Sequence, residues 1–160
     1  MFEDIITDRL IIRCLRDEDA APMFAYRSLP EVLQYQMWEP KVLADVETFI
    51  VRMGDEVWNT VGWYQVAIAS RQDNALLGDL GICLYEYDSR IAGVGITLAP
   101  QYQGKGYATE ALTAVLSLLF DELKKHRVCA TVDPRNRKSA ALLERVGMRQ
   151  EGHSIESLWF

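Results

Sequence analysis

The stretch Pro100-Gln101-Tyr102-Gln103-Gly104-Lys105-Gly106-Tyr107-Ala108-Thr109-Glu110 decides how this chain folds and what it can bind. A strand pattern ends at Leu98, a short loop with glycines follows, and a helical pattern begins at Tyr107. Glycine lets the backbone bend tightly and approach a ligand closely. The first N–H groups of a helix lack intrahelical partners and lie at the positive end of its dipole, so they form an anion site. The order strand, glycine loop, helix therefore predicts a phosphate-binding loop.

Three phosphate-binding motifs compete for this loop. A P-loop fails twice, because Ala99 takes the place of its first glycine and Gly106 the place of its Ser or Thr. A dinucleotide fingerprint fails as well, because Thr109 stands where its third glycine belongs. The third pattern, Gln/Arg-x-x-Gly-x-Gly/Ala, is matched by Gln101-x-x-Gly104-x-Gly106. The motif is short, and a plain glycine-rich turn between strand and helix is the alternative interpretation.

Outside this loop the 160 residues form one α/β pattern without an internal repeat or linker. Strands are expected over residues 9–15, 63–70, 75–85, 91–98 and 127–132 and from 148 onward; helices are expected over 20–27, 44–57, 107–125 and 138–146. Strands first and then β–α–β–α–β predict a mixed sheet with helices on both faces. The helix over 107–125 is apolar around most of its circumference, which predicts a buried central helix.

Composition and charge exclude several classes of function. The formal net charge is −6, which argues against nucleic acid as the main partner, although a local basic patch exists at 135–138. No apolar run approaches the about 20 residues that cross a bilayer, and residues 1–13 do not resemble a signal peptide, so a cytoplasmic protein is expected. Cys14, Cys83 and Cys129 lie in apolar runs and are expected to be buried, inert thiols; no spacing indicates a metal site.

Seven segments, which include the glycine loop, carry a family resemblance over almost the whole chain. They are Thr7–Arg13, Asp17–Ala20, Leu77–Gly81, Leu98–Pro100, Gly104–Ala111, Asp133–Ser139 and Leu142–Met148. With these segments the sequence resembles the GNAT superfamily of N-acetyltransferases, especially the branch of ribosomal-protein N-terminal alanine and serine acetyltransferases. The resemblance implies one GNAT domain over residues 1–160: a mixed, mostly antiparallel central sheet with helices on both faces and splayed strands at the cofactor site.

The resemblance also implies a function, namely transfer of an acetyl group from acetyl-CoA, as co-substrate and without a metal, to a primary amine by direct attack in a ternary complex. The amine would belong to a protein N-terminus or a small molecule. Neither nucleic acid nor a membrane is expected as a partner, and the chain could form a homodimer. The implied coenzyme-binding residues are Leu98, Gln101, Gln103, Gly104, Lys105, Gly106, Tyr107, Ala108, Asn136 and Ser139.

Two of these residues have implied roles in the chemistry. A backbone N–H near Leu98 would donate to the thioester oxygen, and the hydroxyl of Ser139 would assist the departing thiolate. The backbone amides from Gln103 to Ala108 would bind the pyrophosphate. Asn136 is equally well explained as an N-cap residue, and Ser139 as a residue that hydrogen-bonds the helix start.

Two positions depart from the family pattern. Gly93 stands where the branch often has a glutamate base, and Leu143 where many members place a tyrosine acid. The remaining acids on the expected acceptor side are Asp79, Glu86 and Asp88, which are typical of solvated strand ends and turns. The departures favour, as an alternative function, a non-catalytic acyl-CoA-binding or regulatory module; a structural interaction protein is a third possibility that leaves the loop unexplained.

The end of the chain is the last departure. Chains of this branch carry a further strand, whereas this sequence stops at residues 157–160, so the strand is either truncated or missing. Its absence would expose a sheet edge and part of the acceptor groove. The sequence does not identify the acceptor, because no specificity code is readable in the first helical region.

Overall fold

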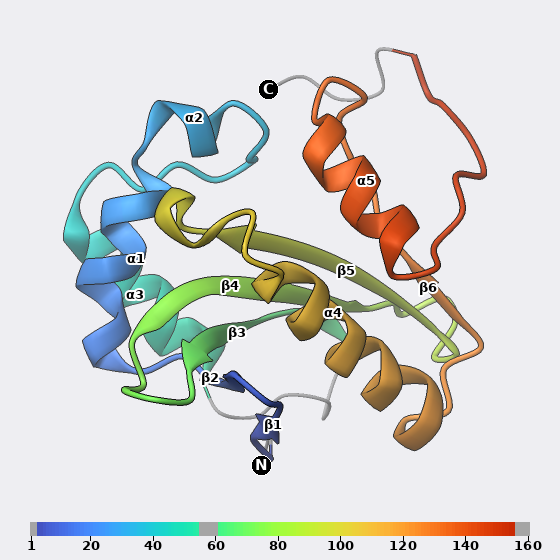
Figure 1. Ribbon diagram of the computed structural model, residues 1–160, viewed down its shortest axis with the longest axis horizontal. Helices are drawn as coiled ribbons and strands as arrows, with labels where there is room; N and C mark the ends of the chain where they lie inside the picture. The colour runs from blue at the N-terminus through green and yellow to red at the C-terminus, as the bar shows by residue number, and fades with distance from the viewer. Residues whose placement is uncertain (1–2, 55–60, 156–160) are drawn as a thin grey trace.

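A computed structural model describes residues 3–54 and 61–155 of the chain. These residues form one six-stranded sheet whose strands lie in chain order (Figure 1). The strands are β1 (Ile5–Ile6), β2 (Leu10–Cys14), β3 (Gly62–Ser70), β4 (Leu76–Leu84), β5 (Ile91–Leu98) and β6 (Arg127–Cys129). β1 to β5 form an antiparallel meander, and β6 pairs with β5 in parallel, so the sheet is mixed as the sequence predicts.

Helices cover both faces of this sheet (Figure 1). The α-helices are α1 (Ala20–Arg27), α2 (Pro30–Leu33), α3 (Leu43–Met53), α4 (Tyr107–Ser117) and α5 (Arg137–Arg145). Shorter helical turns are η1 (Asp17–Asp19), η2 (Pro100–Tyr102) and η3 (Leu118–Glu122), of which η3 is a π-helical continuation of α4. None of the helices in the described ranges has the length and apolar character that a membrane crossing requires.

The alternation of residues along the strands divides the core into two layers. Residues of one parity, such as Val66 and Leu80, are buried against Leu112 of α4. Residues of the other parity, such as Ala67, are buried against Val46 of α3 and its neighbours on α1. Paired residues of neighbouring strands share a face, so the strand register determines which side chains meet at the site. The fold class expected from the sequence is confirmed.

Most boundaries agree with the sequence pattern, and α1 and β5 agree completely. Other expectations are wrong. The long helix ends at Glu122, because Lys124 adopts a left-handed φ of 52°. Phe120 on this helix is 43% exposed, so α4 and η3 bury one face rather than their whole circumference. The strand at 127–132 ends at Cys129, and no strand forms within residues 148–155. The three cysteines are half-buried rather than buried. The expected helical residues 55–57 lie outside the described ranges.

The absence of a strand in residues 148–155 follows from how α5 ends and from a contact with β6. Gly147 has a φ of 91° and ends α5, and the Met148 N–H then donates to the carbonyl of Leu143 at 2.9 Å. The chain after this cap runs beside α5 without joining the sheet (Figure 1), and Glu151 pairs with Arg127 of β6. An ion pair therefore holds this segment near β6 where backbone pairing was expected.

Candidate active site

The glycine loop forms the first part of the site. Gly104 and Gly106 have φ values of 73° and 83°, which L-residues rarely adopt, and Gly106 is the N-cap of α4. The first intrahelical bond of α4 runs from the Glu110 N–H to the Gly106 carbonyl, 3.0 Å. The N–H groups that precede this bond are those that a helix start leaves without an intrahelical partner. A Cβ built at Gly104 meets no atom within 4 Å, so a ligand can approach the backbone there.

A clamp from the first strands holds this loop in place. Glu110, in the first turn of α4, accepts hydrogen bonds from the Thr7 hydroxyl at 2.6 Å and from Nε of Arg9 at 2.7 Å. Arg9 also donates to the carbonyl of Lys105 at 2.9 Å and lies 4.4 Å over the ring of Tyr107. Burial raises the pKa of Glu110, but the hydrogen bonds from Thr7 and Arg9 outweigh it and lower the pKa overall. The carboxylate therefore stays ionised and fixes the loop to the segment between β1 and β2.

Replacing Arg9 with methionine is expected to weaken acetyl-CoA binding about five- to tenfold, because the loop loses its bond to Lys105 and its ion pair with Glu110. Titration calorimetry measures the change. Arg16→Met is the matched control, since Arg16 is similarly exposed (48% against 46%) and its ion pair, with Glu18 at 3.6 Å, does not involve the loop. Equal affinities in the two variants would show that the clamp does not position the loop.

The second part of the site is the gap between β5 and β6. The two strands pair only at Ile91–Arg127, Ala92–Val128 and Gly93–Cys129. β5 then continues to Leu98, and within the described ranges no strand pairs with its last five residues on that side. The splayed strands that the resemblance implies are therefore present. The loop is tied to the end of this gap, because the Gln103 side chain donates to the Leu98 carbonyl at 3.0 Å.

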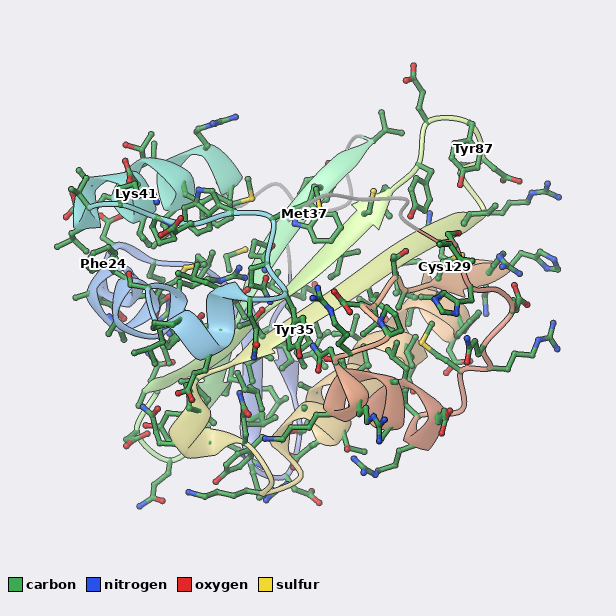
Figure 2. The ribbon with its side chains drawn as sticks, turned by 90° about the horizontal axis from the view of Figure 1, so that it is seen from above. Phe24, Tyr35, Met37, Lys41, Tyr87 and Cys129 are labelled. Carbon is green, nitrogen blue, oxygen red and sulfur yellow. The ribbon has the colours of Figure 1, made fainter. Side chains whose placement is uncertain are left out.

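The third part of the site is the start of α5. Asn136 is its N-cap, and its side-chain oxygen accepts the N–H of Ser139 at 3.2 Å. Both residues are half-buried. The capping interpretation of Asn136 is confirmed, and it leaves the hydroxyl of Ser139 available for another partner. Across from this helix, Tyr35 on the segment after α2 interacts electrostatically with Arg135, and Figure 2 shows Tyr35 lying between α2 and α5.

Two of the acids expected near the acceptor, Asp79 and Asp88, are held in ion pairs with arginines, whereas Glu86 is exposed. Asp79 is 0% exposed, so its interpretation as a solvated strand-end residue is wrong. Its carboxylate pairs with Arg27 and accepts hydrogen bonds from Tyr26 and Gln65. Burial and the Asp79 carboxylate raise the pKa of Tyr26 well above its usual value, so the Tyr26 hydroxyl keeps its proton and donates it to Asp79 in a hydrogen bond. This buried network stabilises the fold. Asp88 pairs with an arginine in an exposed turn, and its pKa is lowered to about 2 by that hydrogen bond.

Glycines form a floor beside the gap, on the face that carries Asp79. The register places Gly81 opposite Gly95 and Cys83 opposite Gly93, all on this face. The indole of Trp63 covers part of this floor, because a Cβ on Gly81 would lie 2.1 Å from its Cζ2. The indole N–H donates to Gln65 at 2.7 Å, which ties the ring to the Asp79 network.

A tyrosine covers the rest of the floor. A Cβ on Gly93 would lie 2.7 Å from the hydroxyl oxygen of Tyr85. Sequence reasoning missed Tyr85 and Trp63, and it also missed Arg9 and Glu110 as a clamp. The alternation Gly93-x-Gly95 is a signal that a flat side chain lies over the strand, but only the register identifies which one.

Comparison with known proteins agrees with this geometry. The sequence profile of the acetyltransferase (GNAT) domain family matches residues 9–149. The uncharacterized N-acetyltransferase YnaD of Bacillus subtilis is 31% identical over 150 residues, which cover 92% of this chain and 84% of that protein. The [ribosomal protein uS5]-alanine N-acetyltransferase of Escherichia coli is 24% identical over 165 residues, covering 96% and 82%. The crystal structure of spermidine N-acetyltransferase from Vibrio cholerae in complex with CoA and spermine superposes with a TM-score of 0.80 at 23% identity, covering 96% and 88%, and shows the shared fold.

Proposed function

Because this chain belongs to the GNAT acetyltransferase family, we propose that it transfers the acetyl group of acetyl-CoA to a primary amine by direct attack in a ternary complex. The observation that carries the proposal is the junction of the glycine loop with the gap between β5 and β6. The loop offers N–H groups to a pyrophosphate, and the gap offers backbone groups to an extended arm. The residues present fit acetyl-CoA as the co-substrate.

The coenzyme is proposed to follow these two features. Its pyrophosphate lies on the amides of the loop and the first turn of α4. The Gln103 N–H already donates to the Pro100 carbonyl at 3.2 Å, so Gly104 to Ala108 supply the amides that this proposal uses. The pantetheine arm lies along β5 in the gap, with Gln101, Lys105, Asn136 and Ser139 around it. Because Leu98 lies beside the loop, its backbone is proposed to bind the start of the arm, and a β5 N–H nearer Gly93 is proposed to donate to the thioester oxygen.

The transfer forms one bond and breaks one. The amine nitrogen bonds to the thioester carbon, the carbon–sulfur bond breaks, and the electron pair leaves on sulfur. A proton passes from the nitrogen to water, and the thiolate takes one from Ser139 or water. An unperturbed alkylamine has a pKa of about 10.4, so a small neutral fraction reacts at neutral pH. With no carboxylate at position 93, proximity in the complex provides most of the acceleration.

The acceptor is proposed to be an amine of a protein N-terminus or a small molecule. Two proteins similar to this chain support these two classes: one is named as an acetyltransferase of a ribosomal-protein alanine, and the other was crystallised with spermine. The second candidate function, a non-catalytic acyl-CoA-binding module, rests on Gly93 and Leu143, where the family's acid and base residues are absent.

Turnover separates the two candidates. Steady-state release of free thiol from acetyl-CoA is measured with a panel of amino-terminal peptides, polyamines and simple alkylamines, and mass spectrometry identifies the acetylated product. The proposed enzyme releases thiol and forms an amide in equal amounts with at least one class. A protein that binds acetyl-CoA but shows neither product with any amine is the non-catalytic module.

Ser139→Ala is expected to lower kcat about tenfold with little change in coenzyme affinity, because an unperturbed thiol has a pKa of about 8.5 and its thiolate needs only modest help to leave. Ser139→Thr keeps the hydroxyl and is expected to restore most of the rate. Stopped assays under saturating acetyl-CoA measure both variants. An unchanged kcat in Ser139→Ala would assign Ser139 to the helix start alone.

A further inference from the structure

The end of the strand pairing between β5 and β6 marks where the thioester should lie. Gly93 is the last residue of β5 that pairs with β6, through Cys129, and the strands separate beyond it. From Leu98 to Gly93 the strand covers roughly 17 Å, a distance that an extended pantetheine arm starting beside Leu98 can follow. The thioester would therefore lie near Gly93, which has no side chain to fill the space beside it.

The hydroxyl of Tyr85 lies at this bare position. A Cβ on Gly93 would be 2.7 Å from its oxygen and 3.4 Å from its ring carbon Cζ, so the tyrosine takes the space of a side chain at 93. Tyr85 follows the last residue of β4, and its ring lies 5.1 Å from that of Tyr87. Figure 2 shows Tyr87 and Cys129 at this same end of the sheet.

The surroundings keep this hydroxyl neutral. Burial raises the pKa of Tyr85, and the titratable groups that face it raise it further: Cys83 on β4, Cys129 on β6 and Tyr87 on the loop. Its oxygen makes no hydrogen bond to any residue in the described ranges 3–54 and 61–155. A neutral phenol with a free oxygen can accept an N–H and donate its own proton. A neutral phenol is a very weak base, and the phenolate that would be a strong base is not formed at neutral pH.

We propose that the Tyr85 hydroxyl accepts a hydrogen bond from the attacking amine and directs its nitrogen toward the thioester carbon. This inference rests on the proposed function and adds the group that orients the acceptor. The hydroxyl holds the amine without removing its proton, which passes to water as the carbon–nitrogen bond forms. The acceptor must therefore arrive as the neutral amine.

Removing this hydroxyl tests the assignment. Tyr85→Phe is expected to lower kcat/KM for the amine about tenfold, the value of one lost hydrogen bond at the upper end of its usual range, and to leave the KM for acetyl-CoA unchanged. Tyr87→Phe is the matched control, because it removes the hydroxyl of the neighbouring ring, which is 75% exposed, and is expected to stay within about twofold. Equal rates for Tyr85→Phe and the unchanged protein would overturn the proposal.

A second variant tests the position of the hydroxyl. Gly93→Ala places a methyl group against the Tyr85 oxygen and should lower the rate in the parent protein. In the Tyr85→Phe background the nearest ring atom lies 3.4 Å away, an ordinary contact, and the 3.2 Å contact with the Cβ of Cys83 is common to both backgrounds, so the same change should cost less than in the parent protein. Additive losses in the two backgrounds would contradict a role for Tyr85 at this position.

The pH profile and acceptor binding complete the test. Because the phenol stays neutral, the loss of rate in Tyr85→Phe should be the same from pH 6 to 9. The rates of the parent and the variant should both rise with the neutral fraction of the amine. A loss confined to part of this range would make Tyr85 a base.

Calorimetry of amines on the CoA-loaded protein separates the two proposals. Amine binding that depends on Tyr85 but gives no turnover would reject acetyl transfer and support the contact between Tyr85 and the amine. Turnover that is insensitive to Tyr85→Phe would support acetyl transfer and reject the contact. Absence of amine binding and turnover would reject both.

Discussion

A Gly104→Val variant is expected to lose at least about a hundredfold in acetyl-CoA affinity while remaining folded. The backbone of Gly104 lies open, and a branched side chain there would occupy the space through which a pyrophosphate reaches the loop amides. The φ of 73° adds strain of about 1–2 kcal/mol, which is small beside the usual 5–15 kcal/mol stability of a domain. Titration calorimetry with acetyl-CoA measures the affinity, and circular dichroism verifies the fold.

Gly54→Val provides the matched control for this experiment. Gly54 also has a positive φ, 58°, and open space around it, but it ends α3 on the other face of the sheet. With a ψ of −163°, Gly54 has a conformation that is essentially restricted to glycine, so the control carries a substantial backbone penalty of its own without touching the loop. Its coenzyme affinity, measured on the folded protein, should match that of the parent protein. Unchanged affinity in a folded Gly104→Val protein would place the coenzyme elsewhere.

Asp79→Asn is expected to lower the free energy of unfolding by about 3–5 kcal/mol, because it leaves the buried Arg27 guanidinium without its counter-charge. Tyr26 and Gln65 also donate to this carboxylate, so their hydrogen bonds weaken as well. Chemical denaturation measures the change, and the midpoint should fall without a change in slope.

Asp88→Asn is the control, because Asp88 makes its ion pair with Arg90 in an exposed turn and its loss should not change stability measurably. Turnover per folded molecule distinguishes structure from chemistry. Neither variant should lose more than about 99% of turnover, which corresponds to about 2.7 kcal/mol of transition-state stabilisation. A stable Asp79→Asn protein that has lost more than this amount would make Asp79 a residue of the reaction.

The sequence pattern predicted the elements that local rules determine. The glycines at 104 and 106 predicted the loop and the start of α4, since only glycine suits their positive φ values. The turn residues at 72–74 and 87–89 separated the runs that predicted β3 to β5, and the Asn136 side chain predicted a helix start. The expected strand after residue 148 failed because the Gly147 cap directs the chain beside α5, a tertiary effect that strand propensity does not contain.

The site residues that sequence reasoning missed depend on strand register. Asp79 appeared to be a strand-end acid, yet pairing with Ala67 and Thr97 places it in mid-sheet beneath α1, where Arg27 neutralises it. Tyr85 meets Gly93 only because β4 and β5 pair as they do. A shift of one residue would turn these side chains to the other face, so no local pattern identifies the contact.

A structure with bound acetyl-CoA, or with CoA and an unreactive amine, decides where the coenzyme lies. Pyrophosphate oxygens are expected within about 3.2 Å of the N–H groups between Gly104 and Ala108, and the pantetheine arm is expected between β5 and β6. The sulfur is expected near Gly93, within about 4.5 Å of the Ser139 oxygen or joined to it by one water. A coenzyme bound away from the loop, or an arm outside the gap between the strands, would show that this loop and gap are not the acetyl-CoA site.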